Sequence, residues 1–126
     1  MINSLKSIKM TINNQKSILQ IQEEFGARYP FLKLEFFKNA HSVYEGSSKR
    51  DMVFKKQLTH LHKVGEIILN DEMTVGELEQ KFKEQFDLNV QVFRKHGNSW
   101  IETTVTDNWS LQKQNEEGKV LSELRF

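Results

Sequence analysis

Cysteine is missing from this chain, proline occurs once, and neither sign of charge dominates, since the formal net charge is +1. The lack of thiols excludes a disulfide framework, a thiolate zinc site and a cysteine nucleophile. No apolar run approaches the roughly 18 residues of a membrane span, and residues 1–6 lack the apolar stretch of a signal peptide. The near-neutral charge provides no general attraction to nucleic acid or anionic lipid. We therefore expect a soluble, cytoplasmic protein with no membrane contact and no cofactor.

The chain does contain an internal repeat. Residues 12–38 align with residues 69–94 when Phe31 is treated as one extra position in the first half. Each half has a hydroxyl residue followed three positions later by Gln or Glu, the spacing of a helix-starting capping box: Ser17 with Gln20, and Thr74 with Glu77. Apolar residues then recur at helical spacing, and a strand-like run follows. The repeat therefore predicts two strand–helix–strand units.

Two such units in succession are typical of one α+β fold, the ferredoxin-like split βαβ sandwich. Periodicity predicts the elements along the chain: strands over residues 7–12, 32–38, 66–70 and 88–95, and helices over residues 17–29 and 75–86. We expect one sheet with strand order 4-1-3-2 and both helices on one side of it. An added strand over 99–104 would lie beside the fourth strand, and a short helix following Asp107 would end at Gly118.

On this interpretation the 126 residues form a single domain. It comprises a duplicated βαβ core at about 7–95, the hairpin strand 99–104 and a C-terminal tail 105–126. Residues 39–64 show no clear pattern and receive no assignment. A β-grasp fold, in which one helix crosses a mixed sheet, is the alternative. The helix start at residues 74–78, Thr-Val-Gly-Glu-Leu, resembles those of ubiquitin-like proteins, although only in the second half of the repeat.

The sheet face away from the helices carries aromatic residues that the core does not need. Alternation places Phe37 and Phe93 there, together with Ile68 and either Trp100 or Ile101. RNA-recognition domains stack bases on aromatics of the two central strands, whereas Phe37 and Phe93 fall on strands expected to lie far apart. Apolar patches usually mark interfaces. We expect the tail 105–126 or a second subunit to cover this face, and the predicted partner-binding residues are Phe37, Ile68, Phe93 and Trp100.

The unassigned region contains a basic segment and a pair of histidines. Basic side chains on a loop can hold phosphates, but the glycine-rich cradle of a P-loop is absent. His60 and His62 share one face only if this segment is a strand, and no third zinc ligand is identified. We expect solvated side chains in both cases. The candidate contacts to an anion or nucleic acid are Lys49, Arg50, Lys55 and Lys56.

Four stretches carry a resemblance to known proteins: residues 22–25 with 34–37, 73–79, 90–95 and 100–107. They resemble small uncharacterised bacterial proteins of the Bacteroidetes type, a family with no assigned function. The resemblance covers about two thirds of the chain. It implies a free-standing bacterial domain and supplies no catalytic or binding residues.

The functional hypothesis rests on two observations, the surplus aromatic residues and the lack of a nucleophile–base pair. They favour a module that acts by protein–protein contact, including self-association, through the open sheet face or an edge strand. One alternative is nucleic-acid binding through the basic loop 49–63. The other is a small-molecule or metal-dependent enzyme centred on His60 and His62.

Overall fold

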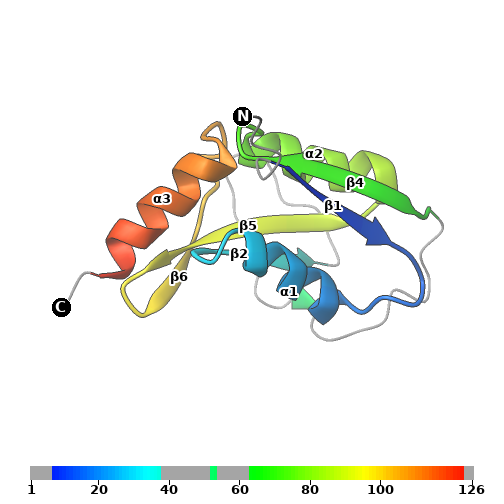
Figure 1. Cartoon of the computed structure of the whole chain (residues 1–126), viewed down its shortest axis with the longest axis horizontal. Coiled ribbons are helices and arrows are strands. Elements are labelled where there is room, and N and C mark those ends of the chain that lie inside the picture. The colour runs from blue at the N-terminus through cyan, green and yellow to red at the C-terminus, as the bar shows by residue number, and fades with distance from the viewer. Residues whose placement is uncertain (1–6, 38–51, 54–62, 124–126) are drawn as a thin grey trace, which may run out of the picture.

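The computed structural model describes residues 7–37, 52–53 and 63–123, and these form an α+β arrangement of two antiparallel sheets and three helices (Figure 1). The elements in chain order are β1 (Ser7–Ile12), α1 (Ile18–Arg28), β2 (Leu32–Phe37), β3 (Met52–Val53), β4 (Gly65–Asn70), α2 (Val75–Phe86), β5 (Asn89–His96), β6 (Ser99–Glu102) and α3 (Leu111–Ser122). Most of the unassigned stretch 39–64 lies outside the described residues.

Both predicted capping boxes are confirmed. The Ser17 hydroxyl accepts a hydrogen bond from the Gln20 amide, and the Gln20 side chain accepts one from the Ser17 amide. Thr74 and Glu77 form the same reciprocal pair at the start of α2. These bonds satisfy amides that a first helical turn leaves without partners. The two helices therefore begin where the sequence indicates.

The strand pairing differs from the expected order. β1 pairs with β4 in a two-stranded sheet, as neighbours in the expected order should. The four predicted strands are β1, β2, β4 and β5, so the expected order reads β5-β1-β4-β2 and places β2 and β5 at opposite edges. In the structure, however, β2 and β5 pair with each other along their length in a second sheet of order β3-β2-β5-β6. Residues 34–37 of β2 and 90–92 of β5 are buried on both faces, because Glu35, Phe37 and Gln91 are buried as well as the core-facing residues. Strands of this kind belong in the middle of a sheet.

The periodic apolar residues of the helices and strands form one hydrophobic cluster. Side chains of α1 and α2 enter this cluster together with those of both sheets, and the Phe36 and Phe82 rings meet edge to face at 6.0 Å. The members are fully or almost fully buried: Met10, Ile12, Ile18, Ile21, Phe25, Leu32, Leu34, Phe36, Ile67, Leu69, Val75, Leu78, Phe82, Phe86, Val90 and Val92, among others. The periodicities of the sequence therefore identify the core correctly.

Helix α3 is longer than expected, and it packs on the same face of the four-stranded sheet as α2, the face that carries Leu32 and Val92. It starts with Ser110, whose hydroxyl accepts from the Lys113 amide, and it continues through Gly118 to Ser122. Gly118 does not end the helix but allows it to approach β5, since a Cβ at this position would lie 3.1 Å from Arg94 Cγ. Neighbouring residues of a strand point to opposite faces. The tail therefore covers the Arg94 side of β5, and not the Phe93 side.

Candidate functional site

Three of the four predicted partner-binding residues lie in the same sheet. Phe37, Phe93 and Trp100 belong to β2, β5 and β6 of the four-stranded sheet, and Ile68 belongs to β4 of the other. Ile68 sits opposite Lys9 and remains 54% exposed. Phe37 is buried, whereas Phe93 and Trp100 are half-buried. The expected patch of four residues is therefore divided between two sheets.

The strand register defines a smaller surface at the outer end of the four-stranded sheet. Phe93 stands opposite both Lys33 of β2 and Glu102 of β6, and Lys95 stands opposite Trp100. Directly opposed residues point to the same face of an antiparallel sheet, as do residues two apart on one strand. We name the five side chains on this face the Trp100 surface: Lys33, Phe93, Lys95, Trp100 and Glu102.

Two lysines flank the indole at the centre of the Trp100 surface. Lys95 Nζ lies 5.0 Å from the Trp100 ring centroid and Lys33 Nζ lies 5.8 Å from it. Ammonium groups at such distances are attracted to the negative face of an indole ring. Two ammonium groups thus hold the tryptophan side chain in place. Its backbone belongs to a strand, which is more rigid than a loop. An anionic group that approaches the indole would meet both lysines.

A buried carboxylate fixes the position of Lys33. Glu35 Oε2 lies 3.0 Å from Lys33 Nζ, and its other oxygen accepts a hydrogen bond of 2.9 Å from Gln22 Nε2 of α1. The Glu35 side chain is only 4% exposed, while that of Lys33 is 44% exposed. A buried charge needs a partner of opposite sign. Lys33 therefore neutralises the buried charge of Glu35, and part of its side chain is still exposed to solvent.

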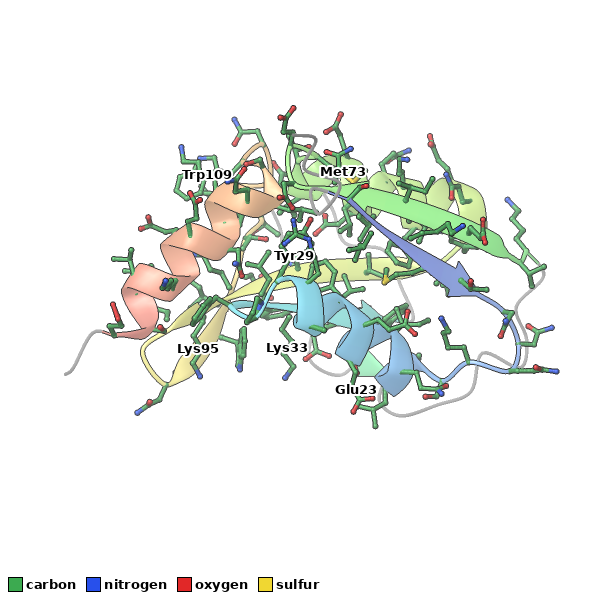
Figure 2. All side chains as sticks on the ribbon, viewed as in Figure 1. Glu23, Tyr29, Lys33, Met73, Lys95 and Trp109 are labelled. Atoms are coloured by element: carbon green, nitrogen blue, oxygen red, sulfur yellow. The ribbon has the colours of Figure 1, made fainter. Side chains whose placement is uncertain are left out.

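An open hollow of about 340 Å³ adjoins Trp100 between α1 and β2. Its lining is mostly apolar, with one carboxylate and one ammonium group: Leu19, Gln22, Glu23, Gly26, Pro30, Leu32, Lys33 and Trp100. Leu19 is an exposed large apolar residue at this position. Figure 2 shows Glu23, Lys33 and Lys95 directed to the same side of the molecule. The hollow and the Trp100 surface therefore form one continuous site, with Lys33 and Trp100 common to both.

A second polar cluster lies at the C-terminal end of α1. Both oxygens of Asp71 accept from Arg28 Nη2, and Asp71 Oδ1 also accepts a hydrogen bond of 3.0 Å from the Tyr29 hydroxyl. Burial and this hydrogen bond raise the pKa of Tyr29 well above its ordinary value. The Asp71 carbonyl accepts from the Gln112 amide at the start of α3. The cluster joins three elements, and we assign it a structural role.

The other tryptophan belongs to the attachment of α3. The Arg94 guanidinium lies 5.4 Å from the Trp109 ring centroid, and Lys113 Nζ lies 4.3 Å from it. Arg94 Nη1 also donates to the buried side chain of Gln114 at 2.8 Å. Trp109 is thus held between the sheet and α3.

The remaining predicted contacts are not described by the structure. Lys49, Arg50, Lys55, Lys56, His60 and His62 all lie outside the described residues. Within residues 7–37 and 63–123, no three His, Asp or Glu side chains are grouped as a metal site would require. Among the helices that are described, none is long and apolar enough to cross a membrane.

The sequence predicts part of this site. It predicts Trp100 and Phe93 as binding residues. It missed the contribution of α1, namely Leu19, Glu23 and the adjoining Pro30. Leu19 lies next to the buried stripe of α1 and is 38% exposed. An apolar residue beside a core-facing stripe is the one local signal that indicated a second contact surface on this helix.

Comparison with known proteins returned no match to a protein-family model, to a curated protein or to a solved structure. The resemblance to Bacteroidetes-type proteins therefore stays a prediction.

Proposed function

We propose that this chain is a small soluble α+β module that works in the cytoplasm by protein–protein contact, with the Trp100 surface and the adjoining hollow as its contact site. The observation that carries the proposal is a half-buried indole, framed by two lysines, beside an open and mostly apolar hollow. Tryptophan is enriched among the residues that dominate binding energy, and such residues fill or border pockets.

The chemistry of the site favours a peptide segment over a small polar substrate. Leu19 and Pro30 offer an apolar contact for one side chain, and Lys33 and Lys95 offer ammonium groups to an acidic neighbour. The carboxylate of Glu35 is already satisfied by Lys33 and Gln22, so it is not available as a general base. The site supplies shape and charge.

A peptide library displayed on phage tests this proposal. We expect enriched peptides to combine an apolar and an acidic residue, and to lose at least about tenfold in affinity for the Trp100→Ala variant, the loss typical of a central interface residue. Ile68→Ala is the matched control, because Ile68 is exposed on the other sheet. Peptides that bind Trp100→Ala as well as the parent protein would contradict the assignment. So would a library that yields no binder, together with a protein that shows no self-association.

We further propose that the two sheets derive from a duplicated, ferredoxin-like βαβ sandwich. The support is the pair of matching capping boxes and the antiparallel β1–β4 pairing. In the order 4-1-3-2 the outer strands are the counterparts of β2 and β5, and curling of such a sheet would bring these two edges together. The observed β2–β5 pairing joins these two outer strands, while the β1–β5 and β2–β4 pairings of the parent sheet are absent among the described residues.

A further inference from the structure

Strand β6 is the outer strand of the four-stranded sheet, and its far edge has no partner among the described residues. The direction of its backbone groups follows from one hydrogen bond of the neighbouring strand β5, because the Lys95 amide donates to the Phe31 carbonyl at 3.0 Å on the β2 side. Lys95 therefore does not exchange hydrogen bonds with Trp100, the residue opposite it on β6. Because successive residues of a strand direct their backbone groups to opposite sides, the N–H and C=O of Ile101 bond to β5. The N–H and C=O groups of Trp100 and Glu102 point outward from the free edge of β6, in the plane of the sheet.

We infer that the occupant of this edge is a second copy of the chain, which pairs antiparallel through β6 and extends the sheet across a two-fold axis. This inference rests on the proposed function and names the partner of the same site. A two-fold axis normal to a sheet keeps each side chain on its own face, so Trp100 and Glu102 can oppose only residues of their own face.

Three registers within β6 pair outward-pointing residues of the same face: Trp100 with Trp100, Glu102 with Glu102, and Trp100 with Glu102 of the second copy. Hydrogen bonding and charge favour the third. Trp100 opposite its own copy forms a single hydrogen-bonded pair within β6, and Glu102 opposite its own copy places two carboxylates side by side, which is unfavourable. Trp100 opposite Glu102 of the second copy, with Ile101 on the axis, forms two hydrogen-bonded pairs. This register uses all four outward groups of each copy's Trp100 and Glu102.

Charge complementarity supports the same register. Lys95 Nζ already lies over the Trp100 ring, 5.0 Å from its centroid. The register places the carboxylate of Glu102 from the second copy on the other side of that indole, about two strand spacings from Lys95, a distance that the two side chains can bridge. The interface involves a short strand, so we expect a weak dimer with a Kd on the order of 10 µM to 1 mM.

Residue-resolved amide hydrogen exchange of the whole chain tests the pairing directly. As the concentration rises from about 10 µM to about 1 mM, the amides of Trp100 and Glu102 should become protected, in step with dimer formation measured by sedimentation. The Ile101 amide is the internal control, because it bonds to β5 and should be protected at every concentration. A protein that stays monomeric over this range, or a dimer in which these two amides still exchange freely, would overturn the inference.

Substitutions at the exposed Glu102 separate backbone pairing from charge. Glu102→Pro removes an outward N–H without touching a β5–β6 hydrogen bond, and it should weaken the dimer about tenfold, since each two-fold interface loses two bonds. Glu102→Ala keeps the N–H and should have a smaller effect. Lys95→Glu and Glu102→Lys should each weaken the dimer, and the double variant should recover it. Unchanged dimerisation of Glu102→Pro would contradict the pairing.

The two proposals can fail separately. If peptides bind through Trp100 and the protein remains monomeric, the pairing with a second copy is refuted, while the proposed contact function stands. Failure of both peptide selection and self-association would remove the proposed function itself.

Discussion

Arg28 and Asp71 form an ion pair that joins the last turn of α1 to the turn between β4 and α2, although the two residues are 43 positions apart. Their side chains are 28% and 13% exposed, so the pair is more shielded from water than the Lys9–Glu66 pair, at 60% and 55%. The Arg28–Asp71 pair holds together segments that the local sequence does not connect.

Replacement of Asp71 by Asn should therefore destabilise the fold. The change keeps the shape of the side chain but leaves the Arg28 guanidinium without its counter-charge, and we expect the free energy of unfolding to fall by about 2 kcal/mol. Urea denaturation provides the measurement. Glu66→Gln is the control and should cost less than about 0.5 kcal/mol, because an exposed ion pair contributes little. Equal effects of the two substitutions would show that the partly buried pair has no special role.

Tyr29 should make stability fall at high pH. Burial and the hydrogen bond to Asp71 raise its pKa in the folded state, while the unfolded chain keeps the ordinary value of about 10. Above that pH the unfolded state releases the phenolic proton and the folded state retains it, so unfolding becomes more favourable as pH rises. Below pH about 10 this contribution is fully present. The tyrosinate absorbance of the folded protein should show one tyrosine that titrates late.

Tyr29→Phe identifies that tyrosine. The late absorbance step should vanish in this variant, and the loss of stability above pH about 10 should become shallower. If the variant loses a normal tyrosine titration step instead, then Tyr29 is not buried against Asp71 as described.

Two helical glycines should respond in opposite ways to alanine. A Cβ on Gly118 would lie 2.8 Å from the Phe31 carbonyl oxygen, and backbone cannot move aside as a side chain can. A Cβ on Gly26 would meet nothing within 4 Å. We expect Gly118→Ala to destabilise by about 1–3 kcal/mol through overpacking, and Gly26→Ala to stabilise by about 0.5–1 kcal/mol through helix propensity. Thermal unfolding of both variants, compared with the parent, tests the docking of α3.

Gln114 should be important for the attachment of α3. Its side chain is fully buried, accepts from Arg94 Nη1 at 2.8 Å and donates to the Thr106 carbonyl at 2.7 Å. Gln114→Leu retains much of the volume but leaves both partners unsatisfied, which should cost about 2–4 kcal/mol. Because Arg94 also lies over Trp109, the emission of this tryptophan should change in a Trp100→Phe background. Gln112→Leu, at an exposed position of α3, is the control.

Part of the candidate site was accessible from the sequence. Aromatic residues that the core does not need indicate Trp100, and strand alternation indicates Phe93 on the same open face. The hollow was not accessible, because it depends on how α1 lies against β2. The division of Ile68 from the other residues was not accessible either, since it depends on the separation of β4 from β2 and β5.

The local features of this protein were determined by its sequence alone: the two capping boxes, the inward-facing stripes of the helices and strands, and the hairpin between β5 and β6. Each depends on residues close in the chain, whose hydrogen bonds and periodicities are encoded within a few positions. The tertiary structure decided that β2 pairs with β5, that α3 covers the Arg94 face, and that Lys33 frames Trp100. These features depend on contacts between distant segments, and they are selected by how completely each arrangement buries apolar surface and satisfies buried polar groups.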